Sequence, residues 1–161
     1  MATPTTLPAT FVAGNVLTAA QQNALRGAFR VLQVVNATFS TAGSSTSSTY
    51  ADSGLTATIT PSATSSKVLV ICNLTLYNTA ASTSAALKLL RGATTVLNTT
   101  GYAFSTGGSQ SSDPTLIALD SPATTSATIY KLQFARESGA GTVIPFPNNN
   151  TGQITLLEIS A

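Results

Sequence analysis

The sequence contains no histidine, no tryptophan and a single cysteine, and it has only seven basic and five acidic residues among 161. Without histidine the chain lacks the commonest general base, the commonest zinc ligand and every Ser–His or Cys–His nucleophile pair. One cysteine forms neither an intrachain disulfide nor a thiolate metal site. Cys72 lies within VLVICNLTL, a context that indicates a small buried hydrophobic residue rather than a reactive thiol.

The acidic residues are equally sparse, and they are spread along the chain: Asp52, Asp113, Asp120, Glu137 and Glu158. Nothing in this spacing indicates the paired carboxylates of a glycosidase or the clustered oxygen ligands of a calcium site. The phosphate-binding patterns GxGxxG and GxxxxGK[ST] do not occur. We therefore expect no catalytic residues, no metal site and no cofactor, and we interpret the protein as a non-enzyme.

The basic residues stand singly, without the basic stripe and interleaved aromatics of a nucleic-acid interface, so we expect no nucleic-acid partner. The beginning of the chain, MATPTTLPATFV, lacks the basic and continuous apolar regions of a secretory signal. No apolar run approaches the roughly 18 residues of a membrane span. We therefore expect no membrane insertion.

Threonine and serine take the place of charge, with 28 Thr and 19 Ser, while hydrophobic residues make up 43%. That hydrophobic share is sufficient for a folded core, and the low net charge of +2 does not fit compositional disorder. Charged residues make up 7%, against about 25% in ordinary soluble domains. The surface is either buried against copies of the chain or coated with hydroxyl groups on β-strands, and we favour burial in an oligomer.

Residues 1–29 are predicted to form an anchoring segment. Pro4 and Pro8 favour an extended arm over residues 1–16, and LTAAQQNALRGAF (17–29) predicts a short helix that begins with a capping box at Thr18 and Gln21. A helix of this length is not stable alone, so it must pack on a partner surface. The residues expected to anchor or assemble the protein are apolar: Phe11, Val12, Leu17, Leu25 and Phe29.

Residues 30–161 are predicted to form one mainly-β domain, an antiparallel β-sandwich or jelly roll. Short strands recur about every ten residues between Gly, Ser, Pro and Asn clusters, which is typical of that architecture. Residues 40–49 are predicted as a loop or a weak edge strand, and residues 107–112 and 143–152 as loops. The predicted strands are 30–39, 54–60, 67–78, 85–91, 93–98, 115–120, 127–135 and 153–160.

The strand predicted at residues 67–78 is apolar on both of its faces. One face carries Val68, Val70, Cys72, Leu74 and Leu76, and the other begins with Leu69 and Ile71. A strand that is apolar on both faces is normally covered on both sides. The second face therefore lies under a partner, a helix or an arm, and we predict that Leu69 and Ile71 lie in an oligomer interface.

Three aromatic residues are candidates for contact with a receptor or glycan. Tyr102 and Phe104 adjoin a Gly/Ser-rich loop, and Phe146 lies between two prolines. The alternative for each is ordinary packing in the core or in a subunit interface.

Several segments together carry a resemblance to a known family: RVLQVVNATFS, GLTATITPSATSSKVLV, LIALDSPATTSATIYKLQF and the final ITLLEISA. They resemble a β-rich domain that recurs in bacteriophage virion surface proteins of the tail-fibre and minor-tail type. FVAGNVLTAAQQNALRGAF resembles the short N-terminal anchor that precedes such domains. The resemblance implies a homotrimeric virion protein with a jelly-roll-like body and without a catalytic motif.

Three functions follow as hypotheses from this resemblance. The first is a short tail fibre or minor tail component that aids host attachment. The second is a capsid decoration protein, because the chain has no shaft, collagen-like repeat or long coiled coil. The third is a lectin-like module that binds host glycans.

The expected partners are copies of the chain, tail or major capsid proteins and possible surface glycans of the host. The expected location is the phage particle, which is assembled in the bacterial cytoplasm.

Overall fold

The computed structural model describes residues 18–19 and 30–160, which form eleven strands and one 3-10 turn. Every strand pairing among them is antiparallel, so the predicted mainly-β antiparallel class is confirmed. The elements are β1 (Val31–Phe39), β2 (Ala51–Ile59), β3 (Lys67–Asn73), β4 (Leu76–Asn78), β5 (Ser84–Arg91), β6 (Thr94–Tyr102), β7 (Gln110–Ser112), β8 (Thr115–Asp120), β9 (Thr128–Ser138), β10 (Val143–Pro145), η1 (Pro147–Asn149) and β11 (Gly152–Ile159).

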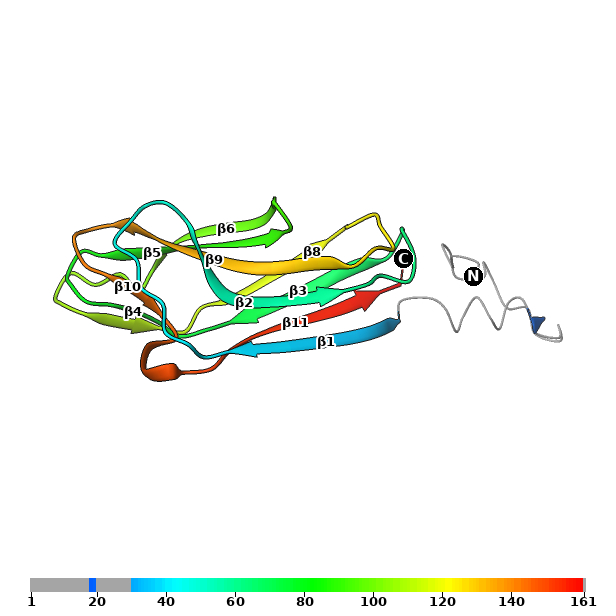
Figure 1. The fold of residues 1–161 in the computed structure, drawn as a ribbon, viewed down its shortest axis with the longest axis horizontal. Coiled ribbons are helices and arrows are strands. Elements are labelled where there is room, and N and C mark those ends of the chain that lie inside the picture. The colour runs from blue at the N-terminus through cyan, green and yellow to red at the C-terminus, as the bar shows by residue number, and fades with distance from the viewer. Residues whose placement is uncertain (1–17, 20–29, 161) are drawn as a thin grey trace, which may run out of the picture.

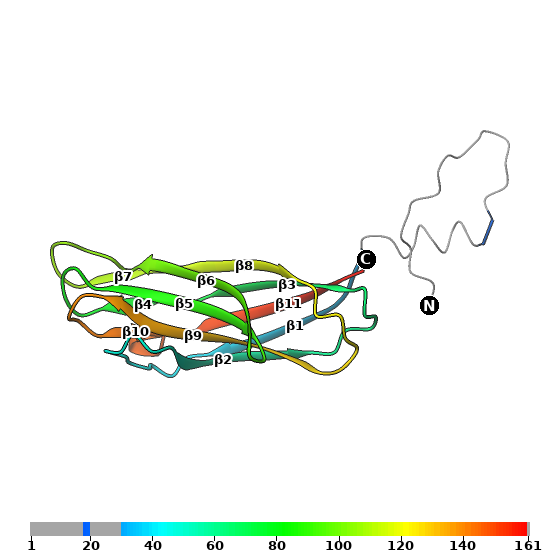
Figure 2. The ribbon, with the colours of Figure 1, turned by 90° about the horizontal axis from the view of Figure 1, so that it is seen from above.

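Two four-stranded sheets form the layers of an elongated sandwich (Figures 1 and 2). One sheet has the order β1-β11-β3-β8 and the other has the order β2-β9-β5-β6. The pairings are nested along the chain, because β1 pairs with β11, β2 with β9, β3 with β8 and β5 with β6. A small third sheet, β10-β4-β7, lies at the end of the body that is remote from Arg30 and Ser160.

The core lies between the two large sheets and follows the alternation predicted from the sequence. Leu55, Ala57 and Ile59 of β2 are buried, as expected from the pattern GLTATIT. The predicted inward faces of 67–78 and 127–135 are buried as well: Val68, Val70, Cys72, Leu74, Leu76, Tyr130, Leu132 and Phe134. Burial raises the pKa of the Cys72 thiol to about 12, which fits the inert, structural role expected for it.

The short strands were not predicted correctly. The predicted strand 67–78 is two strands, because β3 ends at Asn73 and β4 begins at Leu76 in a different sheet. β7 and β10 lie within segments that were predicted as loops. Both are three-residue strands that pair with β4 through their backbones. Such short strands show no alternation of apolar and polar side chains from which they could be predicted. Residues 40–49 form the predicted loop, with one isolated bridge between Ser45 and Val143.

A buried carboxylate organises the end of the sandwich where β1 begins. Glu158 lies on the inward face of β11 and is completely buried. Its Oε2 accepts a hydrogen bond from Gln33 Nε2 at 2.7 Å, and its Oε1 accepts hydrogen bonds from Ser62 N and Ser62 Oγ, each at 2.7 Å. Gln33 Nε2 also donates to the Thr60 carbonyl. The carboxylate therefore ties the turn between β2 and β3 to β1 and β11.

A second polar cluster joins the two large sheets at the same end. Asp120, at the end of β8, accepts hydrogen bonds from Arg91 Nη1 at 2.8 Å and from the Tyr130 hydroxyl at 2.7 Å. Arg91 Nη1 also donates to the Ser121 carbonyl at 3.0 Å. Burial, followed by the hydrogen bond and charge of Asp120, raises the pKa of Tyr130. The Tyr130 hydroxyl therefore stays protonated and donates across the sandwich.

The substitution Tyr130→Phe is expected to lower the free energy of unfolding by about 1.5–3 kcal/mol, the usual contribution of a hydrogen bond to a charged group. Urea titration followed by circular dichroism measures the change. Tyr77→Phe is the matched control, because the half-buried Tyr77 has no hydrogen bond from its hydroxyl to any other described residue. Equal losses in the two variants would contradict the assigned role of the Tyr130–Asp120 contact.

Candidate functional site

The outer surface of the β1-β11-β3-β8 sheet carries rows of side chains that cross all four strands. The register aligns Val34, Leu157, Leu69 and Leu119 in one row, and Asn36, Thr155, Ile71 and Ile117 in the next. A third row is entirely polar and consists of Thr38, Gln153, Asn73 and Thr115. The sheet surface is therefore apolar toward the end where β1 begins and polar toward the small third sheet.

We use the name apolar face for the six hydrophobic residues of the first two rows: Val34, Leu69, Ile71, Ile117, Leu119 and Leu157. The members on the edge strands are strongly exposed, with Val34 at 59%, Ile117 at 61% and Leu119 at 64% of their surface in solvent. Antiparallel sheets with one face in water normally carry polar residues on that face. A contiguous apolar surface of this kind is typical of an interaction site.

Leu69 and Ile71, the predicted interface residues, lie on β3 at the middle of this face and are half-buried by their neighbours on β11 and β8. Tertiary structure adds Val34, Ile117, Leu119 and Leu157, which the sequence analysis did not single out. The strand TLIALD (115–120) contains the missed signal, since its Ile117 and Leu119 alternate with the buried Leu116 and the half-buried Ala118.

Charge is almost absent from the vicinity of the apolar face. Among the described residues that face outward on this sheet, the nearest ionisable one in the register is Lys67, which is opposite Ile159 and donates from Nζ to Ser121 Oγ at 2.7 Å. When another surface covers a face that has no carboxylate or ammonium group, no charge is buried and no charge has to be desolvated. The surface is thus suited to association with another apolar surface.

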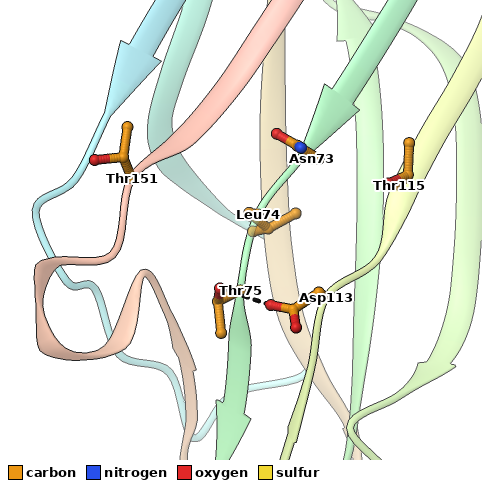
Figure 3. A pocket seen from close by; sticks show the side chains of 6 residues that line it. All are labelled: Asn73, Leu74, Thr75, Asp113, Thr115 and Thr151. Carbon is orange, nitrogen blue, oxygen red and sulfur yellow. Dashed lines mark hydrogen bonds between the residues drawn. The ribbon is translucent and has the colours of Figure 1, made fainter.

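A polar pocket adjoins the third row, where β3 passes into β4 and β7 passes into β8 (Figure 3). Its volume is about 250 Å³, and its lining residues are Asn73, Leu74, Thr75, Asp113, Thr115 and Thr151. Asp113 Oδ1 accepts a hydrogen bond from Thr75 Oγ1 at 2.7 Å, which the dashed line in Figure 3 marks. Leu74 is buried and provides the apolar part of the lining.

The segment PFPNNNT (145–151) ends at Thr151, its one residue that lines the pocket, and is held by Phe146. The Phe146 amide donates to the Thr75 carbonyl at 2.9 Å, and its ring packs edge-on against Phe39 with centroids 5.5 Å apart. A Cβ at Gly152 would lie 2.3 Å from the Phe146 ring, so only glycine fits there. These contacts fix Thr151 at the rim of the pocket.

The three aromatic candidates for receptor contact are not brought together. Phe146 is completely buried, so the prediction that it is available to a receptor is wrong. Its backbone adopts a left-handed conformation (φ 56°) that turns the ring into the core. Tyr102 is half-buried against the core, and Phe104 is 52% exposed in the loop after β6. None of the three lines the pocket.

The predicted anchoring residues Phe11, Val12, Leu17, Leu25 and Phe29 lie outside the described residues. The segment to which they belong joins the β domain at Arg30, whose carbonyl accepts a hydrogen bond from the Ser160 amide at 2.9 Å. Arg30 is followed by Val31, which is opposite Ile159 in the register and next to the apolar face. The predicted anchor therefore joins the body beside this face.

Within residues 18–19 and 30–160, no group of three or more Cys, Asp or Glu side chains is arranged to hold a metal ion. No helix in the same part of the chain has the length and hydropathy needed to cross a membrane. Comparison with known proteins adds no family, because no protein-family model matches the sequence and a search of curated proteins finds no match.

Proposed function

We propose that this protein is a non-enzymatic structural component of a bacteriophage virion surface that assembles as a homotrimer through its apolar face. The role we favour is that of a short tail fibre or minor tail protein that aids attachment to the host. The observation that carries the proposal is the exposed apolar face on the β1-β11-β3-β8 sheet. The phage assignment rests on the sequence resemblance, and the assembly rests on this face.

We propose that copies of the chain cover the apolar face. The apolar face of one copy packs against the apolar face, or the margin of that face, on another copy. The face contains no charge that would require a complementary partner. Its three most exposed side chains belong to the edge strands β1 and β8, so they reach outward at both sides of the sheet. Covering such side chains is favourable by about 25 cal/mol for each Å² of apolar surface removed from water. Self-association is therefore the simplest way to bury them.

The strand order supports the jelly-roll part of the proposal. Jelly rolls consist of eight strands in two sheets that contain two Greek keys. When the eight long strands are numbered in chain order, the two sheets read 1-8-3-6 and 2-7-4-5. This strand order arises when one long antiparallel hairpin folds over into two sheets. In that hairpin strand 1 pairs with strand 8, strand 2 with strand 7, strand 3 with strand 6 and strand 4 with strand 5. The small β10-β4-β7 sheet extends the roll at one end.

The position of Arg30 supports the division into an anchor and a body. Residues 1–29 join the β domain beside the apolar face, at the same end as the Glu158 cluster. In a trimer packed through this face, three such segments start close to the axis. We propose that they bind the rest of the particle, while the end with the β10-β4-β7 sheet points away from it.

The oligomeric state is the first test of this function. Multi-angle light scattering on the purified full chain is expected to give three times the chain mass of 16.3 kDa. The trimer is expected to persist at high salt, because the contact that holds it contains no ion pair to be screened. A stable monomer in dilute solution would refute the assembly.

The position on the particle is the second test. Immunogold labelling of intact phage is expected to place the protein on the tail, in few copies. Gold distributed over the capsid faces, with hundreds of copies in each particle, would refute the tail assignment and establish capsid decoration instead. Absence of the protein from purified particles would refute both.

A further inference from the structure

The polar pocket at the junctions β3–β4 and β7–β8 has a donor and acceptor set that the assembly proposal does not use. Among the described residues, no other side chain or backbone group hydrogen-bonds to the side chains of Asn73, Thr115 or Thr151. The Asp113 carboxylate receives one side-chain hydrogen bond, from Thr75, at Oδ1. As Figure 3 shows, these side chains surround the pocket from three separate chain segments.

The chemistry of the lining excludes most classes of ligand. No lysine or arginine lines the pocket, and Asp113 would repel a phosphate or another anion. Calcium takes six to eight oxygen ligands and usually several carboxylates, whereas only one carboxylate is present. An apolar ligand would cover Asp113 Oδ2 and the Asn73 amide without giving them hydrogen-bond partners, which is costly. What fits is a neutral molecule that carries several hydroxyl groups.

We propose that this pocket binds one residue of a carbohydrate. The free lone pairs of Asp113 accept hydrogen bonds from two neighbouring sugar hydroxyls, and the Asn73 amide both donates and accepts. Thr115 and Thr151 supply hydroxyls at the rim, and the buried Leu74 contributes the apolar part of the lining. The volume of about 250 Å³ is below that of pockets that enclose drug-sized ligands, so it suits a single sugar unit.

The position of the pocket is compatible with the proposed trimer. Asn73 and Thr115 belong to the polar row of the sheet, two register positions along the strands from Ile71 and Ile117 of the apolar face. Leu74, Thr75 and Asp113, which also line the pocket, lie beyond that row along the chain, next to β4 and β7 of the small third sheet. This proposal adds a ligand to the proposed function. It rests on that function only for the source of the sugar, which is a glycan of the host surface.

The test uses the full chain, labelled with ¹⁵N, and a panel of free hexoses, 6-deoxyhexoses and N-acetylhexosamines. Each sugar is offered at about 10 mM, because a shallow site for one sugar unit binds with millimolar affinity at best. At least one sugar is expected to give saturation transfer and to shift the amide resonances around Asp113, Thr115 and Thr151. The proposal would be overturned if no sugar of the panel binds. It would also be overturned if calcium or inorganic phosphate shifts these resonances and no sugar does.

Variants of the lining residues assign the binding to the pocket. Asp113→Asn keeps an acceptor for Thr75 but removes the charge, and it is expected to weaken sugar binding about tenfold or more. Thr151→Val removes one exposed hydroxyl and is expected to weaken binding less. Asp52→Asn is the matched control, because this exposed carboxylate lies on the other large sheet, and binding should be unchanged.

The same variants separate this proposal from the assembly. Asp113→Asn and Thr151→Val are expected to retain the unfolding temperature and the light-scattering mass of the unmodified protein. Sugar binding that survives in both lining variants would overturn the proposal. Loss of sugar binding together with an unchanged mass would support the pocket without any dependence on how the copies assemble.

Discussion

Replacement of both Leu69 and Leu119 by lysine is expected to convert the trimer into a folded monomer, so that the mass from light scattering falls to one third. The two leucines are opposite each other on β3 and β8, and both point away from the core. Lysine at these positions keeps its ammonium group in water in the monomer, but the trimer would bury six uncompensated charges. Removing charged groups from water without partners costs several kcal/mol for each ion, which exceeds what the apolar contact supplies.

The polar row of the same sheet provides the matched control for this variant. Thr38→Lys and Gln153→Lys add the same two charges to neighbouring strands, in the same outward direction, but outside the apolar face. We expect that double variant to remain a trimer. A leucine variant that keeps the trimeric mass, or a control that dissociates equally, would show that the apolar face is not the contact between copies.

Replacement of Glu158 by alanine is expected to lower the free energy of unfolding by at least about 3 kcal/mol. The substitution removes the buried carboxylate that accepts hydrogen bonds from Gln33 Nε2, Ser62 N and Ser62 Oγ. It also releases the turn between β2 and β3 from β1 and β11. Urea titration near neutral pH measures the loss, and an effect below about 1 kcal/mol would contradict a buried, ionised Glu158.

The pH dependence of stability provides an independent check on the same carboxylate. Burial by itself raises the pKa of Glu158, but the hydrogen bonds donated by Gln33, Ser62 and Ser66 together outweigh it, so the pKa lies below the ordinary value of 4.5. A carboxyl group whose pKa is lower in the folded state stabilises the fold above its unfolded pKa. That stabilisation is lost as the pH falls from about 4.5 through the pKa of the folded state.

Glu158→Gln isolates this contribution, because the glutamine keeps the shape but does not titrate. The difference in unfolding free energy between the parent protein and this variant is expected to be largest near neutral pH and to shrink as the pH falls below 4.5. Asp52, whose pKa is lowered by hydrogen bonds from Gln133 and Lys131, is present in both proteins and cancels in the difference. A difference that does not change with pH would indicate that the pKa of Glu158 is the same in the folded and unfolded states, and a difference that grows as the pH falls would indicate a raised pKa in the folded protein.

The long strands and the core were predictable because their signal is local. Alternation in GLTATIT and in ATIYKLQFA placed Leu55, Ile59, Tyr130 and Leu132 inward, and all four are buried. The predicted bounds of the strand 115–120 coincide with those of β8. Strands that pair through their backbones without such alternation, namely β7 and β10, were not predictable in this way.

The candidate sites were predictable only in part. Leu69 and Ile71 were recognised because apolarity on both faces of one strand is visible in the sequence. Their neighbours Val34, Leu119 and Leu157 join them only through strand register, which pairs residues that are 50, 88 and 123 positions apart in the chain (Leu69 with Leu119, Leu69 with Leu157, and Val34 with Leu157). The pocket depends on tertiary structure entirely, since Asn73, Asp113 and Thr151 come from three segments whose proximity no spacing reveals.

A charge-poor, mainly-β protein with an inert buried cysteine follows from composition and alternation, because both act on each strand separately. Tertiary structure alone decided which strands became neighbours. Their register set Leu69 and Ile71 in a face that crosses four strands, buried Phe146 in the core, and placed Glu158 under the turn between β2 and β3. The physical reason is that pairing and burial depend on contacts between distant segments, and these arise only when the whole chain folds.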